Sequence, residues 1–334
     1  MSDKKITDKD YLFLSSLLRA REAGMLSGEK LEQMLAAGSF TEAAKLLAEA
    51  GWPDVSDMNR GEVDNALSER RENLFAEIAR ITPEPEVVDI FRIRYDYHNA
   101  KSIIKGEAMN MEVGYLLSGA GRVACEKLEE AFREDDYRFV PAALGHAMQD
   151  AKSLLARTGN PQMTDFLLDR ACYGEMSECA EKLGNSFITG YVRLLIDGAN
   201  LRTALRCTRM QKDTEFMKLA LISGGSVSVE RIAQAMTGGE GLIGAFGTTA
   251  YKEAAALGAE AIKGGRMTAF ELECDNTVNR YLEDASMKGF GPETVVGFLA
   301  AEENNITAVR LVLTGFLAGI EPEKLKERLR DSYA

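Results

Sequence analysis

The sequence predicts an all-α protein of three pseudo-equivalent helical modules, closed into a funnel with approximate threefold symmetry. Apolar residues recur at helical spacing along almost the whole chain. Glycine and proline separate these stretches, with only seven prolines in 334 residues. One pattern of a long helix returns three times at the spacing of a module, which is far longer than the period of a solenoid repeat.

An asparagine stands in an apolar row of each long helix, three residues after an acid. The pairs are Asp96 and Asn99, Asp197 and Asn200, and Glu302 and Asn305, with the asparagines 101 (200 − 99) and 105 (305 − 200) positions apart. A buried amide costs about 1–3 kcal/mol unless it is hydrogen-bonded, so we expect one polar contact that is reused at a helix-to-turn or module-to-module joint. Alternatively, these rows lie at the edge of the core and the amides face water.

Other helices are predicted in order at residues 10–21, 29–36, 40–49 and 62–81. Thr82 is expected to cap the Asn99 helix, with Pro83 and Pro85 in its first turn and its end at Lys105-Gly106. Short amphipathic helices are expected at 122–133 and 229–236.

A glycine turn follows each long helix and precedes a short one. The four copies are Leu26-Ser27-Gly28, Leu116-Leu117-Ser118-Gly119, Leu221-Ile222-Ser223-Gly224 and Leu317-Ala318-Gly319. If the first and last copies lie side by side, the modules 7–108, 109–212 and 213–334 close into a ring. The first copy is irregular, with Ser15 in the asparagine position and Leu12 in the acid position. An open, curved array of helix pairs is the competing layout.

Composition excludes several classes of partner. Forty basic and 52 acidic side chains give a net charge of −12, which disfavours nucleic acid and anionic lipid. The sequence shows no signal peptide and no apolar run that could insert into a membrane, so a cytoplasmic location is expected. The five cysteines contain no Cys-x-x-Cys pair and are expected to be reduced and packed.

No catalytic, cofactor-binding or metal-binding residue is predicted. The segments 119–124 and 239–244 resemble dinucleotide-binding loops in their glycines. The turn that repeats the first has lost the spacing, and the second follows a predicted helix rather than a strand. His98 and His146 lack a nucleophile or metal partner in the sequence pattern, so structural roles are expected.

Basic residues gather on the repeated helices of this acidic chain. The candidate partner contacts are Arg94, Lys101, Lys105, Arg202, Arg206 and Arg310. They could bind an acidic partner helix. Ion pairs within a module, with Asp96 and Asp197, are the alternative.

Three passages together resemble the C subunit of the V/A-type rotary ATPases, whose counterpart in the eukaryotic vacuolar enzyme is the d subunit. They are residues 11–27, the run from Arg80-Ile-Thr-Pro-Glu-Pro-Glu through Arg94-Tyr-Asp-Tyr-His-Asn-Ala-Lys to Gly106, and the run from Glu303-Asn-Asn-Ile-Thr-Ala-Val-Arg through Leu313-Thr-Gly to Leu329. The resemblance spans the chain but is loose between about residues 121 and 185. Thr307 stands where Lys or Arg is usual, and Gly51-Trp52 where an aromatic residue, commonly Tyr, closes the first module.

The resemblance implies a non-catalytic rotor subunit. Such a protein is a monomer in isolation and a single copy in its complex, and it joins the central stalk (the D and F subunits) to the membrane proteolipid ring and transmits torque. It would serve proton or sodium transport, or ATP synthesis, without a cofactor. A helical-repeat scaffold for an unrelated soluble partner is the alternative, and an enzyme with a site in the cavity is a third possibility.

Overall fold

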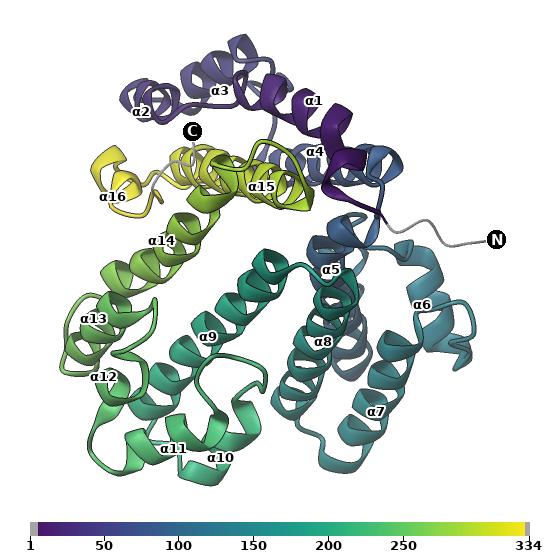
Figure 1. The fold of residues 1–334 in the computed structure, drawn as a ribbon, viewed down its shortest axis with the longest axis vertical. Helices are drawn as coiled ribbons and strands as arrows, with labels where there is room; N and C mark the ends of the chain where they lie inside the picture. Colours follow the sequence, from purple (N-terminus) through teal and green to yellow (C-terminus); the bar gives the residue numbers. More distant parts are fainter. Residues whose placement is uncertain (1–5, 331–334) are drawn as a thin grey trace. The chain divides into compact units, whose positions relative to one another are not determined.

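The computed structural model describes residues 6–330, whose regular elements are all helices and which contain no β-strand. The predicted all-α class is therefore confirmed, while the three modules and the funnel stay predictions. The helices are α1 (Leu12–Glu22), α2 (Gly28–Ala36), α3 (Phe40–Glu49), α4 (Arg60–Ile81), α5 (Glu86–Met109), α6 (Cys125–Glu134), α7 (Ala142–Thr158), α8 (Pro161–Leu183), α9 (Ser186–Arg209), α10 (Thr214–Ala220), α11 (Val229–Thr237), α12 (Gly241–Phe246), α13 (Lys252–Ile262), α14 (Met267–Ser286), α15 (Pro292–Leu317) and α16 (Pro322–Lys326) (Figure 1). Two 3₁₀ turns, Asp8–Tyr11 and Gly114–Leu116, complete the described elements.

Short polar side chains start many of the helices. Ser27, Ser39 and Ser228 each accept a hydrogen bond from the backbone N–H three residues later. Asn59 does the same for α4, and Glu62 bonds back to the Asn59 N–H to complete a capping box. These caps satisfy donors that a helix start leaves unpaired.

The prediction that Thr82 caps α5 is wrong. Thr82 ends α4, where its hydroxyl donates to the Ile78 carbonyl at 2.6 Å, and α5 begins only at Glu86. A residue that precedes proline is pushed out of the helical region. Pro83 and Pro85 impose this restriction on Thr82 and Glu84, so the chain leaves the helical region after α4 and resumes it at Glu86.

The predicted end of α5 at Lys105-Gly106 is also wrong, because the helix continues to Met109. A Cβ on Gly106 would lie 2.5 Å from Val113 Cγ1, so this glycine permits the returning chain to pack closely against the helix. The helix ends instead at Asn110, whose φ is 49°, and the Met111 N–H donates to the Gly106 carbonyl at 2.9 Å. The end of α9 repeats this turn at Gln211, whose φ is 52°.

The chain forms two compact units. Unit 1 comprises Met1–Val88 and Glu271–Ala334, and unit 2 comprises Asp89–Phe270. In unit 1, α15 packs against α2, α3 and α4 (Figure 1). Their shared core includes Leu31, Met34 and Val63 from the early helices and Val309 and Val312 from α15, all of them buried.

Unit 2 is built around two long helices, α5 and α9, and α8 contacts both of them. On one side, Lys105 Nζ pairs with Asp165 Oδ2 at 2.8 Å and Lys101 pairs with Asp169, which sets α5 and α8 antiparallel. On the other side, α8 packs directly on α9. The loops that follow α5 and α9 return onto these helices and form the contacts described next.

Candidate functional site

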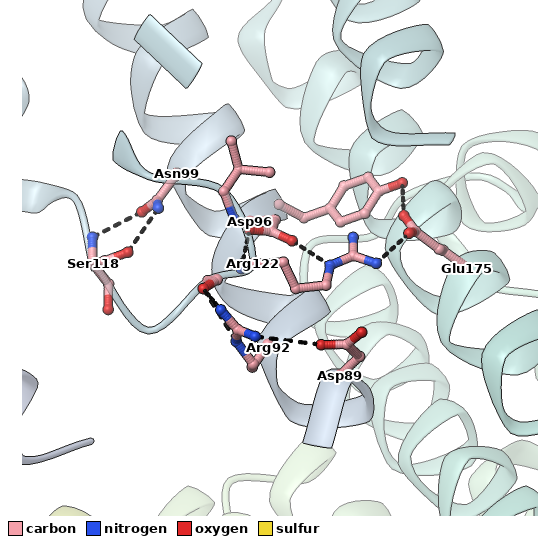
Figure 2. Close-up of polar contacts among 10 residues, drawn as sticks. Asp89, Arg92, Asp96, Asn99, Ser118, Arg122 and Glu175 are labelled. Atoms are coloured by element: carbon pink, nitrogen blue, oxygen red, sulfur yellow. Dashed lines mark hydrogen bonds and ion pairs between the residues drawn. The ribbon is translucent and has the colours of Figure 1, made fainter. Parts of the chain in front are cut away.

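The side chain of Asn99 binds the loop that follows its own helix. Its Nδ2 donates to the Ser118 carbonyl at 2.8 Å, and its Oδ1 accepts from the Ser118 N–H at 2.9 Å (Figure 2). Asn99 is fully buried. The amide therefore satisfies both of its functions on one backbone residue, as a buried amide requires.

Asp96, one turn earlier on α5, binds the same loop further along. Its Oδ1 accepts the N–H groups of Arg122 at 2.8 Å and Val123 at 3.1 Å, and its Oδ2 accepts Arg122 Nε at 2.6 Å. A Cβ on Gly121 would collide with this carboxylate. Arg92 completes the contact by donating through Nη2 to the Gly121 carbonyl at 2.7 Å. We call this set of contacts the α5 joint.

The same arrangement recurs on α9, where we call it the α9 joint. Asn200 exchanges two hydrogen bonds with the backbone of Ile222, at 2.7 and 2.8 Å. Asp197 Oδ1 accepts from the N–H groups of Ser226 at 2.9 Å and Val227 at 3.3 Å, and Oδ2 accepts the Ser226 hydroxyl. A Cβ on Gly225 would collide with Asp197 as one on Gly121 would with Asp96.

The two joints correct the predicted alignment of the turns by one residue. Sequence reasoning matched Ser118 with Ser223, but the contacts match Ser118 with Ile222 and Arg122 with Ser226. The error arose because the shared Ser-Gly pair is coincidental. The backbone positions that receive the asparagine and the acid are four residues apart in both loops, whatever their side chains.

The third pair, Glu302 and Asn305 on α15, does not hold a loop in this way. Glu302 is buried and, among residues 6–330, accepts only from Arg70 Nη2, at 3.2 Å, while Asn305 is half-buried. The position of Asn305 agrees with the edge-of-core alternative. Gly24 is the counterpart of Gly121 and Gly225, because each lies four residues before the start of a short helix, α2, α6 or α11. A Cβ on Gly24 would approach only the Arg21 carbonyl, at 3.5 Å, and no carboxylate.

Sequence reasoning did not identify Arg122 and Glu175 as residues of the site. Arg122 Nη1 pairs with Glu175 Oε1 at 2.7 Å, and the Tyr97 hydroxyl donates to Glu175 Oε2 at 2.9 Å (Figure 2). Burial disfavours the Arg122 cation, but hydrogen bonds and attraction from Glu175 and Asp96 outweigh this and raise its pKa. Burial raises the pKa of Asp96, and Arg122 opposes that shift. No sequence signal pairs a loop arginine with a glutamate 53 (175 − 122) residues away.

Lys101, Lys105 and Arg310, which were among the predicted partner contacts, form ion pairs within the chain. Lys101 and Lys105 bind aspartates of α8, and Arg310 Nε binds Asp64 of α4 at 2.7 Å. The alternative of ion pairs within a module is wrong for these three residues, since each pair joins two of the predicted modules, and Asp96 pairs instead with Arg122. Arg94 and Arg206 are exposed and Arg202 is half-buried.

The glycine-rich segments and the two histidines weighed as binding or catalytic candidates lie in loops and on helices of the fold. Residues 119–124 form the loop of the α5 joint, and residues 239–244 follow α11 and enter α12. His98 Nε2 lies 3.0 Å from the Leu116 carbonyl oxygen, and His146 is exposed on α7. Within residues 6–330 there is no group of three or more His, Cys, Asp or Glu side chains suited to a metal ion.

Residues 14–328 match the protein family described as ATP synthase (C/AC39) subunit. The chain belongs to this family. It is 26% identical to the C subunit of the V-type sodium ATPase of Enterococcus hirae, over 97% of this chain and 99% of that protein. It is 22% identical to the C subunit of the A-type ATP synthase of Methanocaldococcus jannaschii, over 96% of this chain and 86% of the relative. The C subunit of the V-type ATP synthase of Thermus thermophilus is 25% identical over 69% of this chain and 72% of its own length.

The family match includes every residue of the α5 and α9 joints. In this C/AC39 family member, no helix among residues 6–330 has the length and apolar composition needed to span a membrane.

Proposed function

We propose that the chain is a non-catalytic rotor subunit of a V/A-type ATPase or ATP synthase. It would join the D and F subunits of the central stalk to the membrane proteolipid ring and transmit torque during proton or sodium transport. The observation that carries this proposal is the family match over residues 14–328, together with three relatives that are named as the C subunits of such enzymes.

The joints are suited to that mechanical role. A protein that transmits torque must not let its helices and loops slide past one another under load. Each joint binds a loop to a helix at two levels, through the asparagine and through the acid, and these asparagine and aspartate side chains are buried. A single such bond contributes only about 1 kcal/mol, but its rupture in a buried place costs about 1–3 kcal/mol more. The joints therefore oppose small displacements strongly.

The remaining parts of the proposal follow from the family. We infer that the chain corresponds to the d subunit of the eukaryotic vacuolar enzyme, is a monomer when isolated, and is present once per complex. It would lie on the cytoplasmic side and associate with the membrane through its partners. Its charge of −12 disfavours direct binding to an acidic lipid surface.

Purification of the rotary ATPase from the source cells through a tagged catalytic subunit tests the proposal. The chain should co-purify at one copy per complex, and cross-links should connect it to the central stalk and to the proteolipid ring. Membranes from cells lacking the chain should retain the ring but hold less of the soluble ATPase sector. If the chain stays in the soluble fraction with an unrelated protein, it is a helical-repeat scaffold and the proposal fails.

A further inference from the structure

A cavity of about 430 Å³ in unit 2 lies at the start of α6, beside the loop of the α5 joint. We call it the α6 cavity. Among residues 6–330, the ionisable side chains in its lining are all basic, namely Arg122, Lys127 and Arg138. Phe139, Val140 and Pro141 form an apolar part of the same lining. The cavity is thus a basic site on a chain whose net charge is −12.

The first turn of α6 lacks an acceptor that two equivalent helices have. The N-cap residues of α2, α6 and α11 are Ser27, Ala124 and Ser228. Each serine hydroxyl accepts the backbone N–H three residues later. Ala124 has similar backbone angles, φ −59° and ψ 139° against −68° and 152° for Ser228, but the Lys127 N–H receives no side-chain cap. An anion at this helix start would accept that N–H and be stabilised by the helix dipole.

Arg122 lines the same cavity with one donor unused. Its Nε binds Asp96 and its Nη1 binds Glu175, but Nη2 is buried and has no acceptor among the described residues (Figure 2). Buried donors are normally hydrogen-bonded, so Nη2 indicates an acceptor that residues 6–330 do not supply. Lys127 is exposed and forms no ion pair with the described residues. The unused groups at this cavity are therefore donors and a cation, which an anionic ligand satisfies.

We propose that the α6 cavity binds an acidic segment of a protein partner. One carboxylate of the segment would take the place of the serine hydroxyl that α6 lacks and accept the Lys127 N–H, with the Lys127 and Arg138 side chains beside it. An apolar side chain next to that carboxylate would lie on Val140, Pro141 and Phe139, whose ring is 83% exposed.

Charge complementarity selects this occupant. The acidic surface of the chain as a whole repels an acidic segment, whereas the basic lining of the α6 cavity attracts it. The segment would therefore be directed to this cavity. This inference goes beyond the proposed function, because it holds whichever complex supplies the segment.

Fluorescence anisotropy of a labelled peptide tests the proposal with the whole chain. The probe is a short glutamate-rich peptide with a single leucine, and its control has glutamine in place of each glutamate. The glutamate peptide should bind in a saturable way, with one peptide per chain, and more weakly as salt is raised. The glutamine peptide should not bind.

Variants of exposed residues locate the site. Ala124→Ser supplies the N-cap hydroxyl, which competes with the carboxylate for the Lys127 N–H. Peptide binding should therefore weaken about threefold while the urea midpoint of the chain rises. Lys127→Gln removes one cation and should weaken binding about threefold. Lys263→Gln, the same change at an exposed residue after α13, is the matched control and should bind like the unaltered chain.

The proposal is overturned if Lys127→Gln and Lys263→Gln bind the glutamate peptide equally well. It is also overturned if Ala124→Ser raises the urea midpoint without weakening binding, since the carboxylate then does not use the start of α6. Inorganic phosphate that displaces the peptide as well as unlabelled peptide does would show a simple anion site, and would reject a protein segment as the occupant.

Discussion

Arg122 and Ser226 occupy the same position in two loops 104 (226 − 122) residues apart, and each donates both its backbone N–H and a side-chain hydrogen to a buried aspartate. Only Arg122 extends further, to Glu175 of α8. The α5 joint is thus a link between a loop and two helices, whereas the α9 joint links a loop to one. Replacing Arg122 should therefore be costly for reasons that do not apply to Ser226.

Arg122→Ser should destabilise the chain by about 3–5 kcal/mol, because Asp96 and Glu175 lose the cation between them in a buried place. Urea denaturation of the variant and of Arg122→Ser with Glu175→Gln measures the effect. The double variant should recover part of the loss, since the glutamine removes the unpaired charge. Equal stability of the single and double variants would show that Glu175 does not depend on Arg122.

Gly121→Ala and Gly225→Ala should each destabilise the chain by about 1–3 kcal/mol, because the added methyl group collides with Asp96 or Asp197. Gly174→Ala is the control. Gly174 lies within α8, and a Cβ there meets nothing within 4 Å. That substitution should stabilise the chain by about 0.5–1 kcal/mol through helix propensity. Unfolding midpoints in urea that are unchanged for both joint glycines would contradict the close contact.

Asn99→Ala should cost about 2–3 kcal/mol, because it leaves the N–H and carbonyl of Ser118 without partners. Asn200→Ala should cost a similar amount of stability. Asn305→Ala, at the half-buried third position, should cost less than about 1 kcal/mol. The three variants form a matched series for chemical denaturation. A loss at Asn305 as large as at Asn99 would mean that the third amide has the same role.

Asp197 should make stability fall as pH rises. Burial raises its pKa, and the hydrogen bonds from Ser226 and Val227 oppose this only in part. The folded chain thus binds this proton more tightly than the unfolded chain, so the stabilisation is full below the ordinary pKa of about 3.9 and is lost as pH rises through the folded-state pKa. As pH rises from about 4 to about 7, the unaltered chain should therefore lose stability relative to Asp197→Asn. Urea midpoints of the two proteins measure this difference.

Asp136 provides the control of opposite sign for this experiment. Its half-buried carboxylate accepts hydrogen bonds from Arg138, which lower its pKa to about 2. Its contribution is present above the ordinary pKa and is lost as pH falls toward the folded-state value. The midpoints for Asp136→Asn are therefore measured between about pH 2 and about pH 4, and a difference there that changes with pH in the same direction as that for Asp197→Asn would refute the assignment for Asp197.

Local signals predicted most of the helices. The bounds of α3 were predicted fully, and those of α2, α4 and α11 to within two residues, because caps and glycines mark their ends. The two errors around α5 have one physical origin. The prolines and Gly106 were read as local signals for the start and the end of α5. Instead, the two prolines delay the start of α5 to Glu86, and Gly106 permits a tertiary contact with Val113.

The candidate site was predicted in part. Asn99 and Asn200 could be found because an amide in an apolar row requires a partner, and the loop was a natural place for it. The sequence could not decide between a joint and the edge-of-core alternative for Asn305, because its counterpart loop, from Gly24 to Ser27, comes from the other end of the chain. Likewise, the bond between Arg122 and Glu175 depends on how α8 packs beside α5, which no short pattern encodes.

Unit 1 joins the earliest helices of the chain to one of the last, and this has a consequence during synthesis. Leu31 and Met34 find their apolar neighbours Val309 and Val312 only after α15 has left the ribosome. Until then, the faces of α2, α3 and α4 that will contact α15 remain uncovered, while Asp89–Phe270 is continuous and can collapse earlier. Nascent chains halted before α15 should therefore attract chaperones through their first 88 residues.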